Sequence, residues 1–131
     1  MCGLGPMAGQ AHHFRQYAPM KIKYAIKRYT DEVNRLYGVM DRQLKNNEYL
    51  AGRYSIADIA CWGWVIPWKN QGQKLSDFPN LKRWFEQVGK RSAVIKGFAA
   101  GKEMRKQLLS ENTKEAKRAK SILFNQRARK I

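Results

Sequence analysis

Cysteine is scarce in this chain of 131 residues, which contains only Cys2 and Cys61. The two do not form a CxxC pair or a disulfide framework, so the sequence favours a reducing, cytoplasmic compartment. A domain of this length buries roughly two-thirds of the surface of its unfolded chain. We therefore expect it to fold without disulfides or a structural metal.

Long apolar runs are also missing. The apolar stretch from Ile59 to Trp68 has ten residues, whereas about 20 are needed to cross a bilayer. The segment from Met1 to Gly9 lacks the basic start and apolar core of a signal peptide. We therefore expect no membrane partner.

Acidic residues are few, and the 26 Lys and Arg against ten Asp and Glu give a formal charge of +16. Residues 102–131 carry a net +7, and the rest of the chain carries a net +9. Such a surplus attracts polyanions. We predict a domain over residues 1–100 followed by a basic tail over 101–131.

The segment from Ile22 to Leu44 has the pattern of an amphipathic helix. Apolar side chains recur every three or four residues, with charged residues between them, at Ile22, Ala25, Ile26, Tyr29, Val33, Leu36, Tyr37, Met40 and Leu44. Pro19, tolerated in a first helical turn, and the Asn46-Asn47 pair bracket a helix of about 26 residues. Its apolar stripe must pack on partner helices.

A second helix is predicted to begin after Ser55. Ser55 as N-cap and Asp58 three residues later have the spacing of a capping box, a structural role. Apolar residues on nearly every face from Ile59 to Ile66 are typical of a helix enclosed by others. We therefore place this helix at the centre of the domain, ending near Pro67.

Further helices are expected after Phe78-Pro79 and after Ser92, where Ser92 is a candidate cap. No alternating strand pattern of useful length occurs, so the predicted fold class is all-α. The basic tail has too thin an apolar stripe to fold by itself. We expect it to be either a docked helix or a disordered segment.

Several segments resemble the C-terminal helical domain of glutathione transferases, and most closely its bacterial Nu-class, disulfide-reductase branch. The resemblance covers about residues 1–100. The segments are Gly3-Leu4-Gly5-Pro6-Met7-Ala8-Gly9-Gln10, His13-Phe14, Tyr17-Ala18-Pro19, Tyr24-Ala25-Ile26-Lys27-Arg28-Tyr29, Asn34-Arg35-Leu36-Tyr37, Tyr54-Ser55-Ile56-Ala57-Asp58-Ile59-Ala60 and Asp77-Phe78-Pro79-Asn80-Leu81-Lys82-Arg83-Trp84.

The resemblance implies roles for five residues. Arg28 matches a family arginine near the glutathione site, where a guanidinium fork can pair with the carboxylates of glutathione. The side chains of Met7, Gln10, Phe14 and Tyr17 match positions beside the hydrophobic or disulfide co-substrate. The alternative is structural: a solvated surface arginine, and four side chains that pack between helices.

The family carries most of its glutathione site, including the group that interacts with the thiol, on an N-terminal thioredoxin-like domain. These 131 residues contain no such segment, and Met1 falls inside the first long helix of the family's helical domain. The resemblance therefore implies a truncated product, inactive alone, descended from glutathione-dependent transferases or disulfide reductases. It also implies a homodimer weakened by the shortened first helix.

The competing hypothesis is a helical module that binds nucleic acid or another polyanion weakly through the tail. Basic residues cluster there at Lys114, Lys117, Arg118, Lys120, Arg127, Arg129 and Lys130. Phosphate neutralisation by such residues is salt-sensitive and blind to sequence. The sequence predicts no catalytic residue and no metal site, since His12 and His13 diverge on a helix and have no other ligand at zinc spacing.

Overall fold

A computed structural model describes residues 2–102, 114, 117 and 118. The chain divides into two compact units, Met1–Lys90 and Arg91–Ile131. The regular structure of the described residues is helical, apart from two isolated β-bridges in the turn around Gly52. This confirms the predicted all-α class. The predicted division into residues 1–100 and 101–131 stays a prediction.

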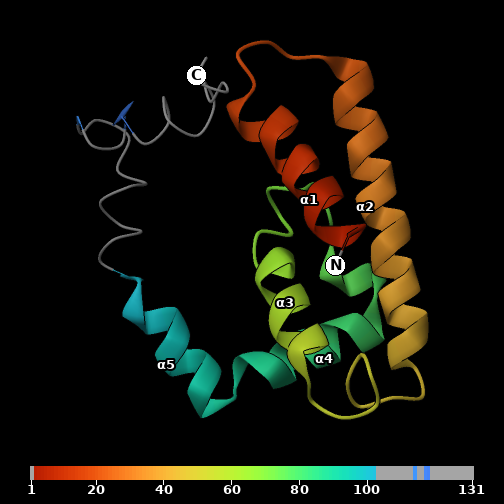
Figure 1. The fold of residues 1–131 in the computed structure, drawn as a ribbon. Coiled ribbons are helices and arrows are strands. Elements are labelled where there is room, and N and C mark those ends of the chain that lie inside the picture. Colours follow the sequence, from red (N-terminus) through yellow and green to blue (C-terminus); the bar gives the residue numbers. More distant parts are fainter. Residues whose placement is uncertain (1, 103–113, 115–116, 119–131) are drawn as a thin grey trace, which may run out of the picture. The chain divides into compact units, whose positions relative to one another are not determined.

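The first unit begins with helix α1 (Leu4–His12), which continues without a break into the π-helical turn η1 (His13–Tyr17). Its buried residues are mostly small, including Gly5, Ala8 and Ala11, and this lets α1 approach its neighbours closely. Helix α1 packs beside α2 (Lys23–Leu44) and also contacts α3 (Ile56–Val65), as Figure 1 shows.

Helix α2 is the amphipathic helix that the sequence predicts, but it has 22 residues and begins at Lys23. The prediction that Pro19 lies in its first turn is therefore wrong. Ala18, directly before the proline, has extended torsion angles (φ −55°, ψ 134°), because a proline ring disfavours the α region for the preceding residue. The chain thus leaves η1 at Ala18 and reaches α2 through the extended residue Ile22.

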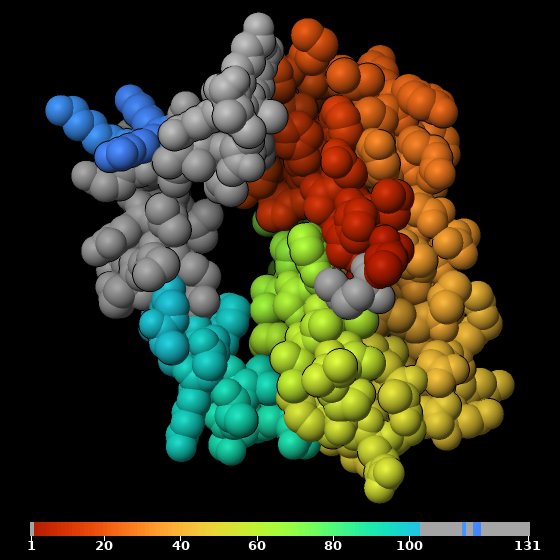
Figure 2. Space-filling view, in the orientation of Figure 1, coloured from red at the N-terminus to blue at the C-terminus, as the bar shows by residue number. Residues whose placement is uncertain are grey.

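Helix α3 begins where predicted, after Ser55, but its surroundings differ from the expectation. Only Asp58 and Val65 are buried, whereas Ile56 is 83% exposed and Ile59 58% exposed. The helices that contact α3 within the first unit are α1 and α4. The prediction of a fully enclosed helix is wrong, because sequence shows how apolar a face is but not whether a neighbour covers it. Figure 2 shows α3 at the molecular surface beside α1.

The core of the first unit lies where α2 meets α4 (Pro79–Gly89), which also contacts the short 3₁₀ turn η2 (Leu75–Asp77). Its large, fully buried apolar side chains are Val33, Tyr37, Leu44, Val65, Leu81, Trp84 and Val88. Pro79 occupies the start of α4. An N–H group at this position has no acceptor within the helix, so the missing N–H of proline costs no hydrogen bond there. A long-range cap completes this end, because Asp41 Oδ1 on α2 accepts the N–H groups of Asn80 (2.8 Å) and Leu81 (2.9 Å).

The second unit contains helix α5 (Ser92–Ala100), none of whose residues is buried. Ser92 does not cap it, because Arg91 occupies the N-cap position and provides no side-chain hydrogen bond there. Most of the basic tail falls outside the described residues. Of the described positions, Lys114, Lys117 and Arg118 are helical and exposed. No described helix is both long enough and apolar enough to span a bilayer.

Candidate functional site

The four predicted wall residues lie along one continuous helical stretch. Met7 and Gln10 are on α1, and Phe14 and Tyr17 follow on η1. Met7 and Phe14 are half-buried, whereas Gln10 is exposed and Tyr17 is 40% exposed. The N–H of Ala18 donates to the carbonyl of His13 at 2.9 Å, a bond spanning five residues. This wider turn shifts Tyr17 from the register that a continued α-helix would give it.

Aromatic stacking fixes this stretch. The ring of Phe14 lies 5.4 Å from that of Tyr29 on α2, with only 5° between their planes, and the rings of His12 and Tyr17 are 5.1 Å apart. One face of Phe14 is therefore a packing contact between helices. Packing between helices and lining a co-substrate site are compatible roles for Phe14. One face of its ring packs on Tyr29, while the edge of the ring can still line a site.

Arg28 lies on the outward part of α2, and 53% of its side chain is exposed. Its guanidinium is 3.8 Å from Glu32, but the carboxylate of Glu32 accepts two shorter bonds from Arg35, at 3.0 and 2.8 Å. The bonds from Arg35 lower the pKa of Glu32. Within the part of the chain that the structure describes, Arg28 thus holds one long, solvent-exposed ion pair, and a guanidinium in this state can pair with a carboxylate ligand.

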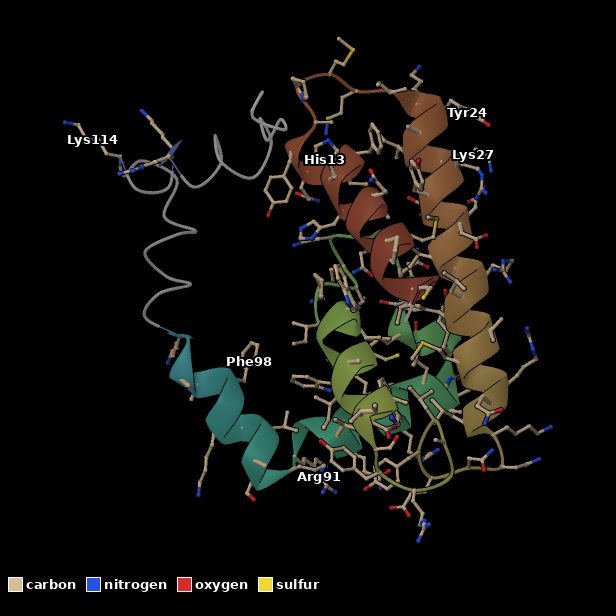
Figure 3. The ribbon with its side chains drawn as sticks, viewed as in Figure 1. His13, Tyr24, Lys27, Arg91, Phe98 and Lys114 are labelled. Carbon is tan, nitrogen blue, oxygen red and sulfur yellow. The ribbon has the colours of Figure 1, made fainter. Side chains whose placement is uncertain are left out.

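The structure brings Arg28 and the wall residues together only indirectly. Tyr29, the next residue on α2, stacks on Phe14. Among the described residues, no hydrogen bond or ion pair joins Arg28 to α1 or η1. Figure 3 shows neighbouring side chains of this part of α2, Tyr24 and Lys27, directed away from the helix. Lys27 pairs with Asp31 on the exposed face.

Ser55 and Asp58 form the capping box at the start of α3. The N–H of Ala57 donates to Ser55 Oγ at 3.2 Å, and the N–H of Ser55 donates to Asp58 Oδ2 at 2.9 Å. Asp58 is fully buried, and its Oδ1 also accepts the N–H of Leu50 (3.0 Å) and the indole N–H of Trp84 (2.7 Å). These bonds occupy the carboxylate, so its role is to join α3, α4 and the preceding turn.

Sequence reasoning missed a buried polar network in the loop after α3. The amide of Gln71, which is fully buried, accepts the hydroxyl proton of Tyr37 at 2.8 Å and donates to the carbonyl of Trp64 at 2.8 Å. Gln73 donates to the carbonyl of Thr30 at 2.9 Å and accepts from Asn34. Burial raises the pKa of Tyr37. A pair of glutamines between a tryptophan-rich helix and η2 is not a recognisable sequence signal.

The cysteines and histidines do not form a reactive centre in the part of the chain that the structure describes. Cys61 is half-buried on α3, and this burial raises the pKa of its thiol, which disfavours the nucleophilic thiolate. Burial lowers the pKa of His12, whose Nε2 has no hydrogen-bond partner. Within the described residues, no group of three His, Cys, Asp or Glu could hold a metal ion.

Comparison with known proteins places these features in context. Residues 14–92 match the sequence model of a family described as "Glutathione S-transferase, C-terminal domain". The disulfide-bond oxidoreductase YfcG of Escherichia coli is 51% identical over 93 residues, which are 70% of this chain and 43% of YfcG. The disulfide-bond oxidoreductase YghU of the same organism is 39% identical over 104 residues, covering 72% of this chain and 36% of YghU.

Solved structures give the same result for the fold. A glutathione transferase of Burkholderia graminis, with two glutathione molecules bound per subunit, aligns with a TM-score of 0.67 at 36% identity, covering 74% of this chain and 44% of that one. A glutathione transferase of Phanerochaete chrysosporium, in complex with oxidized glutathione, aligns with a TM-score of 0.71 at 30% identity. The alignment covers 77% of this chain and 48% of that one. This chain therefore spans less than half the length of these relatives.

Proposed function

The chain belongs to the glutathione S-transferase family, and on that premise we propose that it is the substrate-side helical half of a glutathione-dependent transferase or disulfide reductase. The observation that carries this proposal is the 51% identity to a disulfide-bond oxidoreductase, within a match confined to the helical domain. We propose further that this helical domain is inactive alone and uses glutathione only beside a thioredoxin-like domain.

In this proposal Arg28 binds a carboxylate of glutathione. Two observations support the assignment: the side chain of Arg28 is half exposed, and Glu32, its ion-pair partner among the described residues, is bound more closely by Arg35. Met7, Gln10, Phe14 and Tyr17 provide a soft apolar wall with one amide for the second substrate, which suits a hydrophobic or disulfide compound. Tyr29 connects the two groups through its stacking on Phe14.

The proposed partners are a thioredoxin-like domain and a second copy of this chain. The exposed apolar side chains on α3, at Ile56, Ile59 and Trp64, support a covering partner, because extended apolar surface in a folded protein marks interaction sites. The proposed compartment is the cytoplasm, where glutathione is kept reduced.

The test is to compare this chain alone with a fusion that carries the N-terminal portion of YfcG, the part that this chain does not match. We expect glutathione-dependent reduction of a small disulfide by the fusion and only background rates from the chain alone. Turnover by the chain alone at the rate of intact YfcG would contradict the proposal. So would a folded, glutathione-binding fusion that has no activity.

The fusion also tests the site residue. Arg28→Ala should raise the KM for glutathione about tenfold with a smaller change in kcat, because one charge-assisted contact to the bound substrate is lost. Arg53→Ala is the matched control, since Arg53 is an exposed arginine in the turn before α3. Equal effects of the two variants would remove Arg28 from the site.

A further inference from the structure

The segment that joins η1 to α2 is exposed throughout. Every residue from position 19 to position 24 is exposed. Large apolar side chains occur at three of these positions: Met20 is 65% exposed, Ile22 41% and Tyr24 79%. Figure 3 shows Tyr24 directed away from α2. We call residues 20–24 the joining segment. Exposed apolar side chains that gather in this way mark an interaction surface.

The joining segment is also basic. Lys21 and Lys23 alternate with its apolar side chains, and the chain has no acidic residue before Asp31. The ammonium of Lys21 donates to the carbonyl of Arg15 at 3.1 Å, which ties the segment to η1 and leaves the positive charge in place. Within the part of the chain that the structure describes, the ammonium of Lys23 has no ion pair and no hydrogen bond. The segment therefore complements an acidic partner.

The backbone of the joining segment can pair with another chain. Ile22 has extended torsion angles (φ −93°, ψ 95°). Among the described residues, no backbone carbonyl accepts the N–H of Met20 or Lys21. An extended polypeptide can therefore accept these N–H groups with its own carbonyls, while alternate side chains of the two chains meet. The pattern favours a polypeptide in which apolar and acidic residues alternate.

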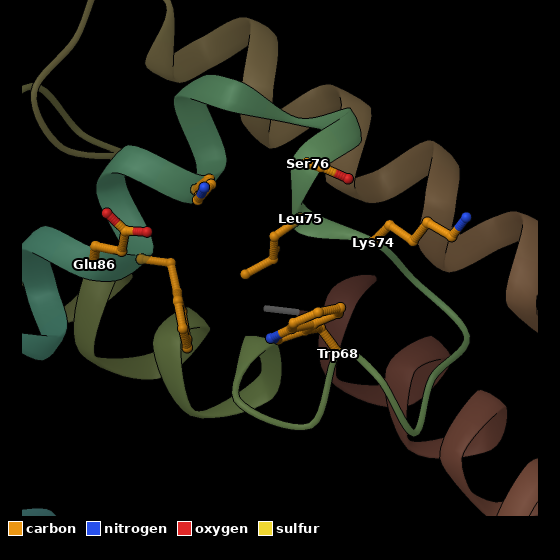
Figure 4. A pocket seen from close by; sticks show the side chains of 7 residues that line it. Trp68, Lys74, Leu75, Ser76 and Glu86 are labelled. Atoms are coloured by element: carbon orange, nitrogen blue, oxygen red, sulfur yellow. The ribbon is translucent and has the colours of Figure 1, made fainter.

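The shape of this surface does not suit a small ligand. Small molecules bind in concave sites that enclose most of their surface. The first unit has such a hollow, of about 440 Å³, but its lining residues come from the loop after α3, from η2 and from α4 (Figure 4). None of them belongs to the joining segment. An exposed segment suits a partner that supplies an extended surface of its own, as a polypeptide does.

The position of the joining segment relates it to the proposed site. It begins three residues after Tyr17, one of the wall residues, and ends four residues before Arg28. We propose that the joining segment binds an acidic, extended stretch of a polypeptide and so presents a disulfide of that polypeptide to the wall. This inference rests on the proposed function, because the wall belongs to the proposed site.

The substrate class is then a polypeptide that contains a disulfide. In the proposed reaction two glutathione thiols are oxidised to glutathione disulfide, and the S–S bond of the polypeptide breaks. Its two sulfurs take the two electrons and the two protons that the glutathione thiols lose, and become two thiols. The joining segment takes no part in this exchange, since its role is to position the substrate.

An anionic bilayer is the alternative partner for a surface with apolar and basic side chains. Segments that bind such a bilayer carry clusters of about four to eight basic residues. The joining segment has two lysines, and the next basic residues, Lys27 and Arg28, each pair with an acidic residue of α2. The polypeptide is therefore the better match.

The first experiment measures binding to the full-length chain by fluorescence polarisation. The probe is a labelled peptide made of two identical chains of alternating leucine and glutamate, joined by a disulfide between their C-terminal cysteines. Met20→Ser should weaken its binding about fivefold through lost apolar contact, and Lys23→Gln about threefold through one lost exposed ion pair. Val39→Ser and Lys45→Gln are the matched controls, since both residues are exposed and lie towards the other end of α2.

Two outcomes of the binding experiment would overturn the proposal. Equal losses in the joining-segment variants and in their controls would mean that the overall charge of +16 attracts the peptide. The second outcome concerns vesicles of phosphatidylserine. Retention of the chain on these vesicles that both joining-segment variants lose, without a loss of peptide binding, would assign the segment to an anionic bilayer.

Turnover by the fusion with the N-terminal portion of YfcG separates this inference from the proposed function. Both joining-segment variants should lower kcat/KM for the disulfide peptide and leave kcat/KM for oxidised 2-mercaptoethanol, a small uncharged disulfide, unchanged. A fusion that reduces the small disulfide, but on which neither variant affects the peptide, would refute the docking inference alone. A fusion inactive on both disulfides would refute the proposed function, and the binding of the peptide to the full-length chain would still decide the docking inference.

Discussion

Two regions of the first unit differ in how completely their side chains are buried and hydrogen-bonded. One is the junction of α2 and α4, and the other comprises the outer faces of α1, η1 and α3. At the junction, Asp41 and Asp58 are saturated by hydrogen bonds, and the apolar side chains around them are fully buried. On the outer faces, η1 buries no residue, and Ile56 and Ile59 of α3 are exposed. We therefore expect the first region to determine stability, and we propose that the second provides surface for binding.

The largest expected effect comes from removing Asp58. Asp58→Ala leaves the N–H groups of Leu50, Ser55 and Trp84 without an acceptor in a buried site, and it should lower the free energy of unfolding by about 3–5 kcal/mol. Ile56→Ala on the same helix, at a site 83% exposed, should change it by less than about 0.5 kcal/mol. Urea unfolding of both variants measures the difference.

An intermediate effect is expected at Asp41, which caps α4 from α2. Asp41→Ala removes the acceptor of the first N–H groups of α4 and should cost about 1–2 kcal/mol. Asp31→Ala on the same helix breaks only the exposed pair with Lys27, so it should cost less than about 0.5 kcal/mol. Equal melting temperatures for these two variants would contradict the contrast between the two regions.

The smallest expected effect concerns pH and the outer region. Burial lowers the pKa of His12 in the folded protein, whereas the unfolded chain has the ordinary value of about 6.5. At a pH between these two values, the unfolded chain therefore binds a proton at His12 more readily than the folded protein does. His12 should therefore reduce the free energy of unfolding as pH falls below 6.5, and it should have no effect above that pH. Thermal unfolding between pH 5 and 8 should show a smaller loss of stability at acidic pH for His12→Gln than for the unmodified protein, and equal losses would contradict the prediction.

The sequence predicted those parts of the fold that depend on local pattern. The three-to-four spacing located α2, and the Ser55 and Asp58 pair located the start of α3, because both signals depend on residues within a few positions of each other. The position of Pro19 was misjudged because its effect falls on Ala18, which leaves the helical region. The capping of α4 by Asp41 joins residues 39 positions apart and has no local signal.

The candidate site was less predictable than the fold. Family resemblance suggested Arg28 and the wall residues, but their positions depend on contacts between helices, such as the stacking of Phe14 on Tyr29. The exposed state of α3 could not be read from its composition, because an apolar face appears the same in sequence whether or not a neighbour covers it. The buried amides of Gln71 and Gln73 were missed for a similar reason.

Arg83 connects the end of α2 to α4. Its guanidinium donates to the carbonyls of Leu44 and Asn47 at 2.9 Å each, and also reaches the carbonyl of Glu48 at 3.3 Å. Last turns of helices usually fray, because their carbonyls have no intrahelical donors. Fraying of the last turn of α2 must therefore also break the bonds to Arg83 on α4. We expect the rates of amide hydrogen exchange at the end of α2 and in α4 to rise or fall together.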